Sequence, residues 1–191
     1  SGSPGERPAC DDVHGDVVVL AGDVVVDAAL ATPTVIVTVE PGSTSVPAAG
    51  STSMTEDLTI APSSSQWFEG SPTTTATYNG AEFWGPTLLM RRGDTVTLNV
   101  TNQLDEETTT HWHGFHIPPE MDGGPHQVIA AGDTWSPSFE VKNLAATYWY
   151  HPHMHETTWR QMNLGAGGLI IVQDDDEDAL ALPRTYGVDD I

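Results

Sequence analysis

The sequence predicts an all-β protein, built as a Greek-key sandwich or barrel with an N-terminal extension. Gly, Pro, Ser and Thr are abundant, and valine is as common as alanine, a composition that favours strands joined by turns. Short runs of strand-forming residues also recur at the spacing typical of such folds. A chain of 191 residues is long enough to bury one core of this kind and to carry an appendage.

The N-terminal part of the chain differs in composition from the rest. Residues 1–12 are polar and contain Gly and Pro, which predicts a flexible leader. Residues 13–53 are predicted to form a β extension followed by a Gly/Ser/Pro-rich linker. Gly-Asp pairs at 15–16 and 22–23 each precede three valines, which is typical of short strands, and 34–39 resembles a third strand. The extension is either an added hairpin or a segment packed on the main domain.

Residues 54–175 are predicted to form the main domain. Its strands are inferred from β-forming runs bounded by turn residues, and they are expected at 57–61, 73–78, 87–91, 95–101, 108–115, 134–141, 147–151 and 166–172. Glycine-centred turns at 92–94 and 131–133 are expected to be hairpins. A helical turn is expected at 156–164.

The end of the chain is strongly acidic. The run from Asp174 to Asp178 is expected to be a solvated exit loop. Residues 176–191 are accordingly expected to lead toward a further domain.

Charge and cysteine content exclude several classes of function. The chain has 27 acidic and 6 basic residues, a net charge of -21, whereas nucleic acids and anionic membrane surfaces are bound by basic faces. The acidic surface indicates either a solubility feature or a salty habitat, where ions screen its self-repulsion. Cys10 is the single cysteine, so an intrachain disulfide and a cysteine-based metal site are both excluded. No apolar stretch is long enough to insert into a membrane.

Five of the eight histidines lie in two short runs, as His111 and His113, and then as His151, His153 and His155. Their alternation with other residues places them on one side of an extended backbone, about 7 Å apart. That spacing suits ligands delivered to two neighbouring ions, and imidazole suits copper, zinc, iron or nickel. Two such strands, if paired, would present four imidazoles to a metal cluster.

Three motifs around these histidines resemble the N-terminal cupredoxin domain of multicopper oxidases, the family of laccases, bilirubin oxidases and cuprous oxidases. They are Thr110-His111-Trp112-His113-Gly114, Met121-Asp122-Gly123-Gly124-Pro125 and Thr147-Tyr148-Trp149-Tyr150-His151-Pro152-His153. The resemblance covers roughly residues 57–175. It implies a cupredoxin-like sandwich and copper as the cofactor.

The resemblance also implies a role for each matching residue. In that family electrons enter at a type 1 copper and pass to a trinuclear cluster held by eight histidines, where dioxygen becomes water. By motif position, His111 would bind the type 2 copper, His113 and His151 one type 3 copper, and His153 the other. Asp122 matches the carboxylate that relays protons to the cluster, although a turn-forming role ahead of two glycines is the alternative.

The sequence departs from the family pattern in one respect, since it contains no His-Cys-His run for a type 1 copper. We therefore expect the N-terminal portion of a larger exported oxidase, inactive alone, with the remaining ligands in C-terminal domains of the same protein. Dioxygen and a small reducing substrate, a phenol, a pyrrole or a metal ion, would be its reactants. The alternatives are a stand-alone copper-binding domain for storage or delivery, and an interaction module that has lost the chemistry. His14, His116, His126 and His155 are not expected to be ligands.

Overall fold

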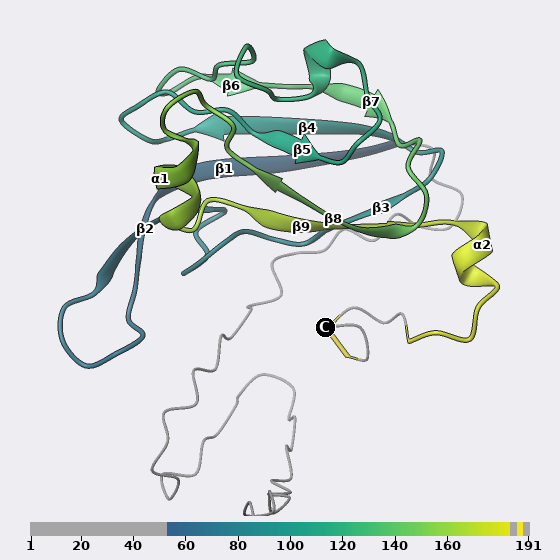
Figure 1. The fold of residues 1–191 in the computed structure, drawn as a ribbon, viewed down its shortest axis with the longest axis horizontal. Coiled ribbons are helices and arrows are strands. Elements are labelled where there is room, and N and C mark those ends of the chain that lie inside the picture. The colour runs from purple at the N-terminus through teal and green to yellow at the C-terminus, as the bar shows by residue number, and fades with distance from the viewer. Residues whose placement is uncertain (1–52, 184–186, 189–191) are drawn as a thin grey trace, which may run out of the picture. The chain divides into compact units, whose positions relative to one another are not determined.

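The computed structural model describes residues 53–183 and 187–188. In this part nine strands form two sheets, accompanied by a 3-10 helix and two short α-helices (Figure 1). The elements are β1 (Ser53–Ser65), β2 (Thr73–Tyr78), β3 (Leu88–Arg91), β4 (Thr95–Asn102), β5 (His111–His113), η1 (Pro119–Met121), β6 (Thr134–Trp135), β7 (Ser138–Glu140), β8 (Ala146–His151), α1 (Thr158–Asn163), β9 (Gly168–Gln173) and α2 (Asp175–Asp178). The predicted leader and almost all of the predicted N-terminal extension lie outside the described residues.

The first sheet has the order β2-β1-β4-β6, and β7 also pairs with β4. β1 runs parallel to β4 and antiparallel to β2. In β4 every second side chain is buried, and those of Val96, Leu98 and Val100 are apolar. Because successive residues of a strand point to opposite faces, this alternation directs one face of the sheet into the core.

The second sheet has the order β3-β9-β8-β5. β8 pairs antiparallel with both β5 and β9, whereas β3 runs parallel to β9. The core lies between the two sheets and contains Trp112 and Tyr150, both fully buried. Gly168 is required by this packing, because a Cβ at that position would lie 2.3 Å from Cζ of Tyr150. The predicted all-β sandwich is confirmed as a mostly β sandwich of two sheets.

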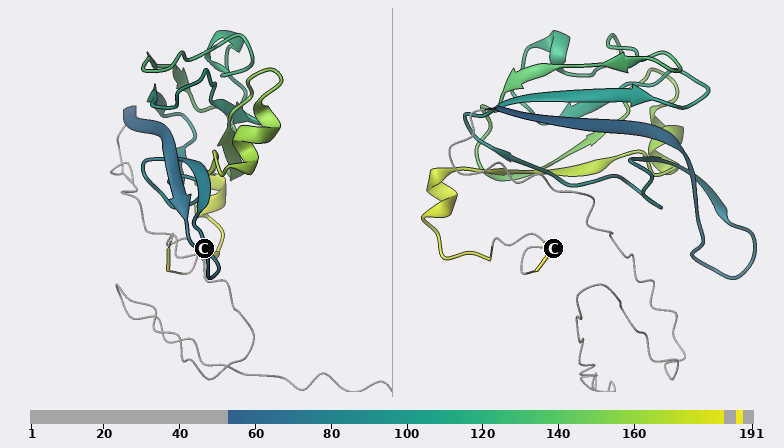
Figure 2. Two further views of the ribbon diagram at one scale, coloured as in Figure 1. Left: turned by 90° about the vertical axis from the view of Figure 1, so that its left-hand side faces the viewer. Right: turned by 180° about the vertical axis from the view of Figure 1, so that it is seen from behind.

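α1 and α2 lie at opposite ends of the sandwich, and the connection between β1 and β2 projects from the end that carries α1 (Figures 1 and 2). Among the described residues, no helix has the length and apolar character needed to cross a membrane.

Several strand boundaries differ from those predicted. β1 begins at Ser53, which the sequence assigned to the linker, and extends well beyond residue 61. The predicted strand at 134–141 is broken into β6 and β7 around Pro137, which has no N–H for a sheet ladder and instead accepts a bond from the amide of Leu98. The predicted strand at 108–115 shrinks to the three residues of β5.

Neither predicted hairpin turn is a hairpin. The turn at 92–94 connects β3, which pairs with β9, to β4, which pairs with β1, so it carries the chain from one sheet to the other. The turn at 131–133 follows an isolated bridge between Thr108 and Ile129 and precedes β6. Turn residues specify the change of direction, but they do not specify which sheet the next strand joins.

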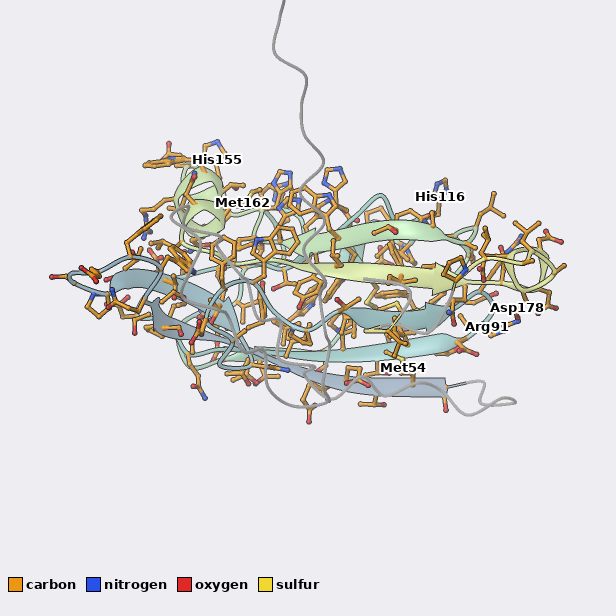
Figure 3. All side chains as sticks on the ribbon, turned by 90° about the horizontal axis from the view of Figure 1, so that it is seen from below. Met54, Arg91, His116, His155, Met162 and Asp178 are labelled. Carbon is orange, nitrogen blue, oxygen red and sulfur yellow. The ribbon has the colours of Figure 1, made fainter. Side chains whose placement is uncertain are left out.

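The acidic run is a helix rather than a solvated loop. Asp174 is buried, and its carboxylate accepts hydrogen bonds from the amides of Glu177 (2.9 Å) and Ala145 (3.0 Å), which caps α2. These two backbone bonds hold the pKa of Asp174 below its ordinary value. Arg91 on β3 forms ion pairs with Asp175 and Asp178 of α2 (Figure 3). The capping bond itself is local, three positions along the chain, so an aspartate N-cap could have been recognised in the sequence, whereas the bond to Ala145 could not.

Candidate metal centre

The two histidine runs lie on neighbouring strands, which is the condition for bringing their imidazoles together. β5 and β8 pair antiparallel, with His111 opposite His151 and His113 opposite Trp149. One ligand nitrogen from each of His111, His113 and His151 lies within 4.8 Å of the other two. We call these three residues the histidine trio.

The closest contact within the trio joins the two strands. Nδ1 of His113 lies 3.1 Å from Nε2 of His151. Two imidazole nitrogens that bind one tetrahedral ion at the usual bond length are separated by about 3.3 Å. Without a metal this contact is a hydrogen bond between the rings, and its length is close to the separation of two ligands of one ion.

Hydrogen bonds to backbone carbonyls orient two rings of the trio. Nδ1 of His111 lies 2.8 Å from the carbonyl oxygen of Asp122, and Nδ1 of His151 lies 2.8 Å from that of Pro152. A carbonyl can only accept, so the hydrogen of each ring is on Nδ1 and the lone pair is on Nε2. Both rings thus present Nε2 as a metal ligand, and this donor set fits copper.

His153 lies next to the trio but outside it. Its ring centroid is 5.2 Å from that of His111 and 5.9 Å from that of His151. Its backbone amide donates to Oγ1 of Thr109 at 2.7 Å. The four predicted ligands therefore form a trio and one neighbour.

The other described histidines are exposed and lie outside the trio. The side chain of His155 is 80% exposed and lies near Glu156. Figure 3 shows His155 beside α1 and His116 toward the opposite end of the sandwich. His126 is exposed, and His14 lies outside the described residues.

Asp122 lies directly against the trio, just after η1. Its Oδ2 is 3.3 Å from Nδ1 of His111, and the carboxylate is about one-third exposed. Its backbone carbonyl accepts from Trp112 N at 3.3 Å, and Nε1 of Trp112 donates to the carbonyl of Met121 at 3.1 Å. These contacts hold the Asp122 loop, residues 119–124, against β5.

Trp149 is a site residue that was not among the predicted ones. Its ring stacks on that of His151, with centroids 4.0 Å apart, and on that of His113 at 5.1 Å. The alternation that placed His151 and His153 on one face extends back to Trp149, so the signal was present in the sequence. The indole limits the orientations open to both imidazoles.

Burial keeps His151 neutral. It is 4% exposed, and this desolvation lowers its pKa to about 4, with a further lowering from the charges of the neighbouring histidines. The bond to the Pro152 carbonyl acts in the opposite direction but is outweighed. At neutral pH the ring is therefore ready to bind a metal without first losing a proton.

In the metal-free chain we expect His151 to remain neutral until the pH falls to about 4. An unfolded histidine is protonated near pH 6.5, so between these values the unfolded chain binds more protons than the folded one. Stability should therefore rise with pH across this window and be lost as the pH falls. NMR titration of the ring protons and urea unfolding at pH 7 and pH 5 measure both effects. A His151 titration near 6.5 would contradict the assignment.

A sequence model of the family described as multicopper oxidase matches residues 60–177, more than half of the chain. This chain belongs to the multicopper oxidase family. Copper is accordingly the metal expected for its domain, and the histidine trio is consistent with copper binding.

Several curated proteins are similar to the chain. The multicopper oxidase mco of Staphylococcus aureus is 43% identical over 126 residues, which cover 66% of this chain and 28% of that protein. The cell division protein FtsP of Xenorhabdus nematophila is 36% identical over 108 residues, covering 56% of this chain and 23% of that protein. The match thus spans less than one-third of the length of these relatives.

Solved structures of multicopper oxidases share the fold. The laccase-like multicopper oxidase CueO of Ochrobactrum superposes with a TM-score of 0.66 and 41% identity, over 73% of this chain and 32% of that one. A laccase of Pediococcus acidilactici gives a TM-score of 0.69 and 35% identity, over 73% and 30% of the two chains. The described domain is therefore the N-terminal cupredoxin domain of a multicopper oxidase.

Proposed function

We propose that this chain supplies half of the trinuclear copper centre of a longer oxidase that reduces dioxygen to water. The observation that carries the proposal is the common face of β5 and β8, where three imidazoles converge and a fourth lies beside them. His111 would bind the type 2 copper, His113 and His151 one type 3 copper, and His153 the other. The 3.1 Å separation between His113 and His151 supports their sharing one ion.

Copper would supply the one-electron redox chemistry that dioxygen reduction requires. The chain's own residues hold the imidazoles in place: the carbonyls of Asp122 and Pro152 set the ring tautomers, and Trp149 stacks on two of the rings. The Asp122 carboxylate would pass on the protons that oxygen reduction consumes, because it contacts His111 and also reaches solvent.

The remaining components would come from outside this chain. The other cluster ligands and the type 1 copper would lie in C-terminal domains of the same protein. A small reducing substrate, a phenol, a pyrrole or a metal ion, would deliver electrons there, so that this chain alone would not turn over. The complete protein would be exported, and the acidic composition supports its exposure to salt.

Copper removal from the complete protein tests this function. Dialysis against a chelator should abolish oxygen uptake with a phenolic substrate, and addition of copper should restore it. Hydrogen peroxide should not accumulate, because the proposed product is water. Undiminished oxygen uptake in the copper-free protein, or peroxide as the main product, would contradict the proposal.

The second candidate is a copper-binding domain for storage or delivery, without oxidase activity. The observation in its favour is that the whole trio is assembled within this one chain. It predicts copper uptake by the complete protein with no oxygen consumption. An interaction module that has lost the chemistry would bind no stoichiometric copper. The similarity to a protein named for cell division makes this alternative worth testing.

A further inference from the structure

Three consecutive threonines precede the first histidine run, and all three are fully buried. Thr108, Thr109 and Thr110 each have no exposed surface. Neighbouring residues of an extended segment point to opposite sides, so this segment is covered on both sides. A buried hydroxyl requires a hydrogen-bond partner, and each of the three therefore identifies a contact.

Each hydroxyl bonds to a different part of the domain. Oγ1 of Thr108 donates to Oε1 of Gln161 on α1 at 2.9 Å. Oγ1 of Thr110 shares a hydrogen bond of 2.8 Å with the hydroxyl of Tyr78 on β2. Oγ1 of Thr109 accepts the backbone amide of His153 at 2.7 Å. Of the three bonds, only that of Thr109 reaches a predicted metal ligand directly.

α1 strengthens the same connection. Gln161 is fully buried, and its Nε2 donates to Oε1 of Glu106 (3.1 Å) and to the carbonyl of Glu107 (3.0 Å). Arg160 also forms an ion pair with Glu106. The helix that follows the second histidine run is thus fixed to the segment that leads into the first.

The backbone position of His153 depends more on the bond to Thr109 than the positions of the trio do. His111, His113 and His151 belong to paired strands, where the ladder sets the backbone position. His153 lies two residues beyond the end of β8, where no ladder continues. The bond from its amide to Thr109 takes the place of the ladder.

We propose that Thr109 is the positioning residue of His153 and fixes the placement of its imidazole relative to the histidine trio. The proposal deepens the proposed function and rests on it. The hydroxyl touches no substrate or metal, and acts through the backbone of the residue it holds. Thr109→Val keeps the shape of the side chain and removes the acceptor, whereas Thr109→Ser keeps the acceptor.

Proton NMR of the 191-residue chain loaded with Co²⁺ tests the proposal. Co²⁺ accepts imidazole ligands, and its paramagnetism shifts ring protons according to their position relative to the ion. His153 therefore reports its position even if it is not itself a ligand. In Thr109→Val, we expect His153 to lose more than half of its cobalt-induced shift while the shifts of the trio persist. Thr109→Ser should restore the His153 shift.

Thr77→Val is the matched control, because Thr77 is equally buried and its hydroxyl bonds to the Ala81 carbonyl, away from the histidines. It should leave all four ring shifts unchanged. A His153 shift in Thr109→Val equal to that of the wild type would overturn the proposal, as would equal changes at all four rings. If the valine variant does not fold, Thr109→Ala replaces it, and the cobalt-induced shifts of His153 and of the trio are compared in the same way. A wild-type chain without any cobalt-shifted histidine would contradict the proposed function itself.

Discussion

Replacement of Gly123 by alanine will destabilise the domain and detach the Asp122 loop from β5, whereas the same replacement at Gly124 will be nearly neutral. Gly123 has a φ of 72°, a conformation that side chains disfavour. A Cβ at this position would lie 1.7 Å from the carbonyl oxygen of Thr110, which is far inside van der Waals contact. The backbone on one side must therefore move.

The movement would break the bonds that hold the loop. Asp122 accepts from His111 and Trp112, and Met121 accepts from the Trp112 indole. Loss of these bonds, together with the backbone strain, gives an expected decrease in unfolding free energy of about 3 kcal/mol or more. His111 would also lose the carbonyl that fixes its tautomer.

Urea unfolding of both alanine variants measures the difference. Gly124 is the matched control, because a Cβ there would meet its nearest neighbours at ordinary distances, 3.8 Å from Gln127 and 3.9 Å from Asp122. If Gly123→Ala unfolds at the same urea concentration as Gly124→Ala, the described packing of the loop on β5 is wrong.

Replacement of His151 by alanine in the complete oxidase should remove type 3 copper and abolish oxygen reduction, while the blue absorbance of the type 1 copper remains. His151 is the most buried member of the trio, and its Nε2 lies 3.1 Å from the neighbouring ligand atom of His113. Its removal leaves His113 without a partner on the same ion. Copper analysis, the visible spectrum and an oxygen electrode measure the three outcomes.

His155→Ala is the matched control for this variant. His155 continues the same alternation in the sequence, but its side chain is 80% exposed, so its removal should leave copper content and oxygen uptake unchanged. Asp122→Asn should retain all coppers and slow turnover, since the imidazoles stay and the titrating carboxylate is lost. Normal oxygen uptake by His151→Ala would refute the ligand assignment.

The sequence predicted that the histidines of each run share one face because a period of two is a local pattern. Alternation alone placed His111 and His113 on one face, and the buried Trp112 on the other. The same rule would have placed Trp149 on the histidine face, had it been applied one step further back along β8. These features require no knowledge of distant contacts.

Two other features depend on distant partners. β5 does not extend back to residue 108, because the backbone of Thr108 pairs with Ile129 in an isolated bridge rather than with β8. The Asp174 carboxylate, besides its local cap on α2, also accepts the Ala145 amide, 29 positions away. Neither Ile129 nor Ala145 can be identified from the residues around Thr108 or Asp174 alone.

The fully buried indole of Trp112 disfavours any other register between β5 and β8. A slip of one residue between these strands would expel the indole into water and turn the histidines toward the core. The apolar contacts of Trp112 thus also fix the register of β5 on β8, and with it the positions of the imidazoles. The packing of the hydrophobic interior thus sets the geometry of the candidate metal site, so that folding alone can arrange the imidazoles before any metal binds.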